Sequence, residues 1–283
     1  MSQKKLLLAA VCLFLLTLSA TAKAIAIRQP SIAERVATAD AVVIGKVESI
    51  EEKTVKAKPI FGGDEIEYRI AVVKVGDGIT GVKGLTHVKI AFQPAANPGG
   101  GIRPGRPQPP KLEKDQEACL LLTKHPTEAF YVMVNAFQII DKTNPNFDDE
   151  VKQVKKLTKL LDDADKSLKS KDADERFLTA AMLVTKYRNQ NFGGNPKNEA
   201  IDADQSKAIL QTLAEADFGK QYPELQGWNA VTVFYRLGVT EKDGFKLPQN
   251  ATQDQLNEAI KKWLKDNADK YRIQRLVAEK SEK

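Results

Sequence analysis

The stretch NPGGGIRPGRPQPPKLEKDQEACLLL, from Asn97 to Leu122, begins with glycine and proline and ends in an apolar run. It either links two domains or forms a loop inside one. The strand-like run HVKIAF (87–92) precedes it, and the strand-like runs ACLLLT (118–123) and AFYVMVNAFQII (129–140) follow it. A linker would leave the later strands without partners for their backbone groups. The sequence therefore predicts a long exposed loop, residues 94–111, within one β domain.

Residues 41–140 follow the two-residue period of a half-buried strand more often than a helical period. The run IEYRIAVVKV (66–75) places apolar side chains on one face and charged side chains on the other. The run AVVIGKVESI (41–50) is a further β-rich segment, which brings the number of predicted strands to five. Five strands are enough for a small barrel.

From Asp148 onward the apolar residues follow the helical period. Residues 148–161 place Val151, Val154, Leu157 and Leu161 on one stripe. Residues 172–188 begin with Asp172 as a predicted N-cap. Two capping boxes are predicted elsewhere in the chain, Ser31 with Glu34 and Thr252 with Gln255. The sequence predicts an all-α helical domain over residues 148–283, after a β domain over 25–147. The predicted fold class is therefore a multidomain α+β protein.

The first 24 residues have the features of a secretory signal peptide. Lys4 and Lys5 precede the apolar run Leu6–Leu16, and small residues at Ala22 and Ala24 fit a cleavage site. The net charge of +6 falls to +3 when Lys4, Lys5 and Lys23 are removed. We expect an exported protein, periplasmic or secreted, with no membrane span after signal removal.

Three phrases of the β half carry a family resemblance: ATADAVVIGKVESIE (37–51), EYRIAVVKV (67–75) and GVKGLTHVKIAF (81–92). They resemble bacterial exported relatives of the netrin-like and metalloproteinase-inhibitor fold. The resemblance implies a five-stranded OB-type barrel. It would also imply a chelating cysteine at the mature N-terminus, and no residue here matches that position. The run DADERFLTAAMLVTKYR (172–188) resembles HEAT or armadillo helix packing.

Side chains suited to catalysis or metal binding are few. After signal removal the chain keeps one cysteine, Cys119, and its histidines are His87 and His125, with no pair at helical spacing. A dyad of Cys119 with His125 is less consistent with the pattern than a core thiol and a loop histidine. The Asp-rich phrases 162–165, 172–174 and 202–204 are predicted as helix starts rather than calcium loops. No catalytic, metal-binding or cofactor-binding residue is predicted.

Two further motifs could suggest ligands. GDGITG (76–81) fits a dinucleotide fingerprint, but no helix follows it, so a loop between strands is predicted. An OB-type barrel could bind nucleic acid through the aromatic residues Tyr68, Phe130 and Tyr131 together with Arg69, but the near balance of charge and the export signal argue against this partner. Arg103 and Arg106 in the glycine and proline stretch form a possible partner-binding loop for an anionic partner.

The sequence favours an exported, non-catalytic two-domain protein that presents a protein- or ligand-binding surface to an unknown envelope or extracellular partner. Two alternatives remain open from the residues. One is an extracellular hydrolase that uses carboxylates. The other is a regulator of an extracellular protease, which rests on the family resemblance alone.

Limited proteolysis tests the predicted loop. An arginine-specific protease that accepts a following proline, such as clostripain, should cut after Arg103 or Arg106 while the two β fragments stay associated, because strands on both sides are expected to share one core. Size-exclusion chromatography under native conditions measures the association. Fragments that elute separately, each with its own cooperative unfolding transition, would show that the stretch is a linker.

Overall fold

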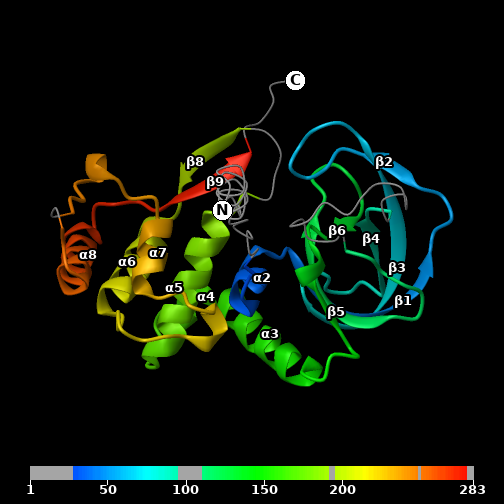
Figure 1. Cartoon of the computed structure of the whole chain (residues 1–283), viewed down its shortest axis with the longest axis horizontal. Helices are drawn as coiled ribbons and strands as arrows, with labels where there is room; N and C mark the ends of the chain where they lie inside the picture. The colour runs from blue at the N-terminus through cyan, green and yellow to red at the C-terminus, as the bar shows by residue number, and fades with distance from the viewer. Residues whose placement is uncertain (1–27, 95–109, 191–194, 248–249, 279–283) are drawn as a thin grey trace, which may run out of the picture. The chain divides into compact units, whose positions relative to one another are not determined.

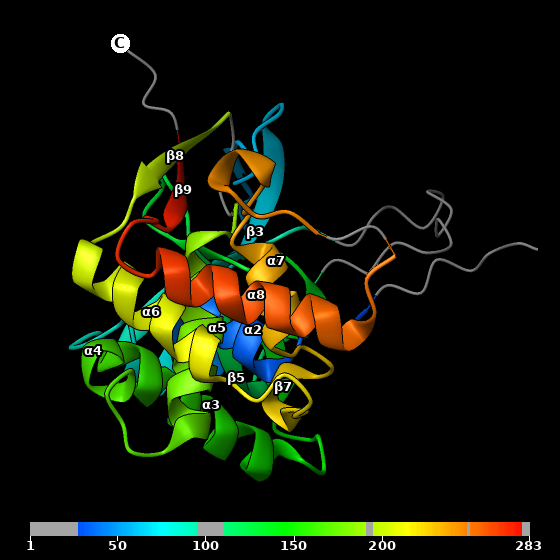
Figure 2. The same cartoon turned by 90° about the vertical axis from the view of Figure 1, so that its left-hand side faces the viewer.

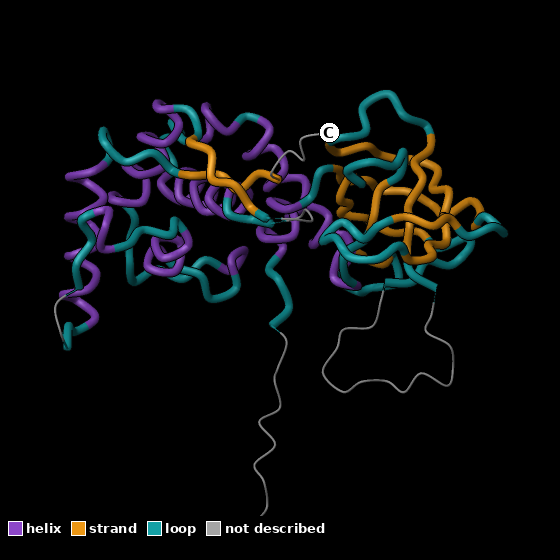
Figure 3. The backbone as a smooth tube through the Cα atoms, turned by 90° about the horizontal axis from the view of Figure 1, so that it is seen from above, coloured by secondary structure: helices purple, strands orange, loops and turns teal. Residues whose placement is uncertain are grey.

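The computed structural model of the chain describes residues 28–94, 110–190, 195–247 and 250–278. In this part the fold combines α-helices with a seven-stranded sheet and a two-stranded sheet (Figures 1 and 3). The strands are β1 (Ala41–Ile50), β2 (Val55–Ala57), β3 (Ile66–Thr80), β4 (His87–Phe92), β5 (Glu117–Lys124), β6 (Tyr131–Val132), β7 (Ile139–Asp141), β8 (Pro196–Ala200) and β9 (Gln274–Ala278). The α-helices are α2 (Ile32–Thr38), α3 (Phe147–Asp162), α4 (Ala164–Ser167), α5 (Ala173–Tyr187), α6 (Ala203–Glu215), α7 (Ala230–Arg236) and α8 (Gln253–Asn267). Short 3₁₀ helices are η1 (Ala136–Gln138), η2 (Pro223–Leu225) and η3 (Glu241–Asp243).

The strand pairings of the large sheet return to their starting strand. The order is β1-β3-β4-β6-β5, and β5 also pairs with β1. All of these pairs are antiparallel except β4 with β6, which is parallel. Strand β7 adds to β5, and β2 adds to β3. Strands β4 and β5, which flank the predicted loop 94–111, belong to this one sheet. Residues 95–109 of that loop lie outside the described part.

Strand β5 and the first three residues of β1, Ala41–Val43, are buried on both faces. Alternate residues such as Val43, Leu120 and Leu122 pack in a cluster made by the sheet itself. The residues between them, including Cys119 and Leu121, pack in a second cluster that contains most of the buried helical side chains. This two-sided burial explains why ACLLLT is continuously apolar rather than alternating.

Most of the predicted strands are present, with three differences. The single strand expected over 129–140 is divided into β6, the 3₁₀ helix η1 and β7. Strand β2 was not predicted. The loop predicted at GDGITG is wrong, because β3 continues to Thr80 through pairs such as Gly78 with Val43.

The predicted helices are present with their caps, but the prediction of an all-α second part is wrong. Ser31 with Glu34 and Thr252 with Gln255 both form capping boxes. Helices α6 and α8 lie side by side (Figures 1 and 2). After α8 ends at Asn267, the chain turns and β9 pairs antiparallel with β8, where a continued helix was expected. In residues 274–278 the backbone pairing with β8 therefore outweighs the helical period of the sequence.

Helix α2 precedes the strands in the sequence but packs with the helices. It contacts α3, α5 and β5 (Figure 1). The described residues from Gln29 onward belong to one compact unit. The boundary between a domain over 25–147 and one over 148–283 stays a prediction, and the signal segment 1–24 lies outside the described residues. No helix in the described part of the chain is long and apolar enough to cross a membrane.

A glycine comparison tests the packing of the turn after β3 on the start of β1. A Cβ at Gly81, where φ is +76°, would lie 2.1 Å from the carbonyl oxygen of Asp40. At Gly84, where φ is +81°, a Cβ would meet nothing within 4 Å. We expect Gly84→Ala to lower the free energy of unfolding by about 1 kcal/mol, the cost of a left-handed backbone, and Gly81→Ala to lower it by about 3 kcal/mol or more. Equal losses in urea unfolding would contradict the packing.

Candidate functional site

A pocket of about 240 Å³ lies on the large sheet, where helix α3 begins. Three strands and the start of α3 contribute to it. The lining residues are Ile44, Gly45 and Lys46 of β1, Lys74, Val75 and Gly76 of β3, Glu117 and Ala118 of β5, and Lys142 with Phe147. Its walls are therefore apolar side chains, backbone and lysine stems.

An irregularity in strand pairing shapes the pocket. Ile44 pairs with Asp77, but the next residue, Gly45, pairs with Val75, so that Gly76 has no partner on β1. This is the pattern of a β-bulge. A Cβ at Gly45 would lie only 2.5 Å from the carbonyl oxygen of Lys74. Glycine is therefore required at this position for the two strands to approach as closely as they do.

Helix α3 is held against the sheet next to the pocket. The Lys155 ammonium lies 2.7 Å from the Asp77 carboxylate of β3. The Thr80 hydroxyl donates a hydrogen bond of 3.3 Å to Asp162 at the end of the helix. The predicted apolar stripe of α3 is confirmed for Val151, Val154 and Leu157, which are buried. These contacts position Phe147, the first residue of α3, at the pocket.

Ion pairs neutralise part of the charge at the pocket. Lys46 lies 2.9 Å from Asp115, and Lys142 pairs with Glu117. The hydrogen bond from Lys142 lowers the pKa of the Glu117 carboxyl, so Glu117 is ionised at neutral pH. The Lys74 ammonium group forms no ion pair or hydrogen bond with another residue that the structure describes. The pocket can hold an apolar group next to cationic side chains, and a Glu117 that stays ionised is a poor proton donor.

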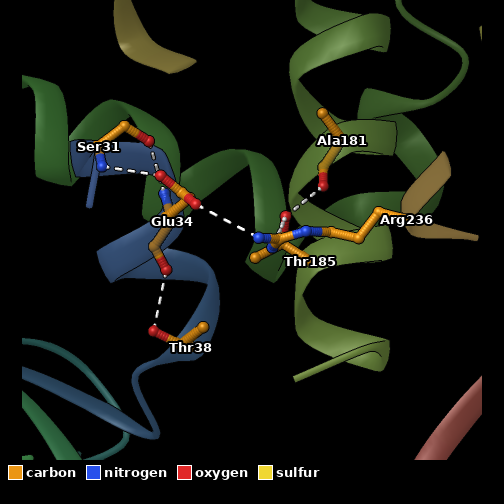
Figure 4. Close-up of polar contacts among 6 residues, drawn as sticks. All are labelled: Ser31, Glu34, Thr38, Ala181, Thr185 and Arg236. Atoms are coloured by element: carbon orange, nitrogen blue, oxygen red, sulfur yellow. Dashed lines mark hydrogen bonds and ion pairs between the residues drawn. The ribbon is translucent and has the colours of Figure 1, made fainter. Parts of the chain in front are cut away.

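A polar network connects helix α2 with helices α5 and α7 (Figure 4). The Glu34 carboxylate accepts a hydrogen bond of 2.9 Å from the Ser31 backbone and lies 3.5 Å from Arg236. Arg236 also donates to the Thr185 hydroxyl, and its guanidinium lies 3.7 Å from the ring centroid of Trp228. The network fixes α2 against α5 and α7.

The neighbouring residue, Arg35, extends the network toward α3 and the sheet. It is 6% exposed and donates a hydrogen bond of 2.8 Å to the Phe137 carbonyl oxygen. Its guanidinium lies 3.4 Å from Glu150, which in turn accepts from the Asn144 amide. Burial lowers the pKa of Arg35, and Glu150 opposes that effect. An arginine remains charged despite such a shift, so the Glu150 carboxylate acts as its counter-ion.

A second pocket, of about 800 Å³, lies between the end of α3, helix α4 and the start of α5. Positive and negative side chains are mixed along its wall. The charged lining residues are Lys156, Lys159, Lys166 and Lys169, and Asp163, Asp165 and Glu175. This mixture of signs favours no ligand charge, so we take the pocket at β1, β3 and β5 as the candidate site.

The structure does not describe the partner-binding loop that the sequence predicts. Arg103 and Arg106 lie outside the described residues. Cys119 and His125, considered as a dyad, pack in different surroundings. Cys119 is fully buried among helix-facing side chains, whereas the His125 ring lies 5.0 Å from Phe130.

His125 supports the loop after β5. Its Nδ1 accepts backbone N–H bonds from Thr127 and Glu128, so Nε2 carries the proton and donates to the Lys58 carbonyl oxygen at 2.8 Å. His87 lies on the surface, 3.1 Å from Glu48. Each histidine thus has a partner within the sheet region, and neither lines the candidate pocket.

The Asp-rich phrases differ in their roles. Asp172 and Asp202 accept backbone N–H bonds at the starts of α5 and α6, which confirms the capping prediction for those two. In 162–165 a helix also starts, with Asp163 at the N-cap position and Asp165 in the first turn of α4, but the Asp163 side chain makes no cap bond, and Asp162 accepts from Thr80. Among the described residues, no group of three or more His, Cys, Asp or Glu could hold a metal ion.

The aromatic residues considered for stacking with bases have other roles. Tyr68 and Phe130 are buried in one small cluster, with ring centroids 6.0 Å apart. The Tyr131 hydroxyl donates to the Gly81 carbonyl oxygen. Arg69 lies 6.0 Å from the ring centroid of Phe92.

The pocket itself was not predicted from the sequence. One available signal was Gly45, a glycine inside a strand-like run, which is typical of a bulge or a close backbone approach. The approach of Lys142 and Phe147 to that bulge depends on tertiary packing. No protein-family model and no curated protein matches this chain.

Thiol chemistry tests the assignment of Cys119 to the core. Burial raises its pKa to about 12 from 9.0. A chain that lacks residues 1–24 should therefore not react with a disulfide reagent at pH 8 when folded, and should titrate one thiol in urea. Because the folded pKa is the higher one, the contribution of Cys119 to stability is complete below about pH 9 and declines as the pH rises toward about 12. Rapid labelling of the folded chain would contradict this burial.

Proposed function

We propose that this chain is an exported, non-catalytic binding protein in which an OB-type β-barrel and a helical part together present a ligand-binding surface. The pocket formed by β1, β3, β5 and the start of α3 is its binding site. The export signal and the netrin-like resemblance predicted from the sequence are part of this proposal.

The strand pairings support the barrel. Five strands pair in a ring, in the order β1-β3-β4-β6-β5, and β4 with β6 is parallel. A five-stranded OB-type barrel has a closed or nearly closed ring of this kind. The bulge at Gly45 and Gly76 lies on this ring, and bulges are frequent next to binding sites.

The observation that carries the proposal is the composition of the pocket. Ile44 and Phe147 offer apolar contacts, and the carboxylate of Glu117 is engaged by Lys142. The described lining residues include no histidine, cysteine, serine or threonine. A site with apolar walls and a few polar groups that set orientation is typical of small-molecule binding.

Ligand titration by NMR tests the proposal with phenylacetamide, a neutral probe. In the ¹⁵N-labelled chain, saturable shifts are expected for the amides of Gly45, Gly76 and Phe147. Replacing Phe147 with alanine removes an apolar wall and should weaken binding by about threefold to tenfold. Phe61→Ala is the matched control, because Phe61 is 53% exposed and does not line the pocket.

Dispersed amide spectra confirm that both variants are folded. Shifts that spread over the surface without saturation would contradict the proposed site. Equal affinities in the Phe147→Ala and Phe61→Ala variants would contradict it as well.

A further inference from the structure

The pocket places two positive side chains opposite each other. Lys46 and Lys74 are direct partners in the β1–β3 register and are both exposed. Like charges directly opposite each other on one face of a sheet are destabilising. Across the other edge of β1, Lys46 is the direct partner of Glu117. That carboxylate is engaged by Lys142. The ion pair of Lys46 with Asp115 relieves the repulsion between Lys46 and Lys74 only in part, because Lys74 has no such partner among the described residues.

The charge balance at the pocket indicates the charge of a suitable ligand. Three ammonium groups, on Lys46, Lys74 and Lys142, face two carboxylates, on Asp115 and Glu117. The remaining charge of +1 matches a monoanion better than a phosphate dianion. The ion pairs of Lys46 and Lys142 leave Lys74 as the ammonium group that has no ion-pair partner among the described residues.

We propose that this pocket binds a small organic monocarboxylate that carries a short apolar group. The carboxylate lies between the ammonium groups of Lys46 and Lys74, and the apolar group lies against Ile44 and Phe147. This inference rests on the proposed binding function and adds the chemical class of the ligand. The bound carboxylate relieves the repulsion between the two lysines.

Two probes of the same shape test the charge preference: phenylacetate, which is anionic, and phenylacetamide, which is neutral. We expect phenylacetate to bind about fivefold more tightly at low salt, the size of effect that a partly exposed ion pair produces. The preference should decrease at 0.5 M salt, because salt screens exposed charges. NMR titration of the full folded chain measures both dissociation constants.

A pair of lysine variants assigns the effect to a residue. Lys74→Gln should bring the affinity for phenylacetate down to that for phenylacetamide. Lys89→Gln is the matched control, because Lys89 lies on β4 of the same sheet, pairs with Glu51 and does not line the pocket. It should keep the fivefold preference.

The outcomes separate this inference from the binding function. If neither probe shifts the pocket amides, the proposed function fails and the inference fails with it. If both probes bind with equal affinity, or if Lys74→Gln keeps the preference, the inference alone is overturned. Tighter binding of phenylacetate that is lost in Lys74→Gln and kept in Lys89→Gln supports it.

Discussion

Helix α2 carries two adjacent charges of opposite sign into the core, and much of the fold depends on their partners. Glu34 faces Arg236 of α7 (Figure 4). Arg35 faces Glu150 of α3 and the Phe137 carbonyl oxygen. A helix of seven residues is too short to be stable alone. It persists because six of its residues are buried and both charges have partners. Removing one partner of a fully buried pair costs about 3–5 kcal/mol, and the 37% exposure of Arg236 reduces that cost for its pair.

The position of α2 has consequences for the sheet and for the pocket. Because α2 packs on β5, and α3 packs on β3 and β7, residues such as Val42, Cys119 and Leu121 share a cluster with helical side chains. Arg35 binds Glu150 in the first turn of α3, three residues after Phe147. The same ion pair that holds α2 therefore fixes the end of α3 that closes the pocket. The binding surface that we propose thus depends on a residue that does not line it.

The sequence predicted correctly those features that depend on residues a few positions apart. The capping boxes at Ser31 and Thr252 and the apolar stripe of α3 follow from near neighbours in the sequence. Strand β9 and the divided β6 and β7 were not predicted, because their conformation depends on pairing with distant segments. Ser31 and Glu34 were recognised as a cap, but the sequence carried no sign that the Glu34 carboxylate also faces Arg236, 202 residues away. The pocket was missed for the same reason, although Gly45 marked the bulge from which it is built.

Native-state hydrogen exchange tests most directly whether α2 is an integral part of one core. The account predicts that the buried amides of Val36 and Ala37 exchange through the same opening reaction as those of β5 and α5, with the same free energy. Raising the urea concentration should then change the exchange of all three elements in parallel. Exchange of the α2 amides that is orders of magnitude faster, and independent of urea, would show that α2 opens by itself and would contradict the account.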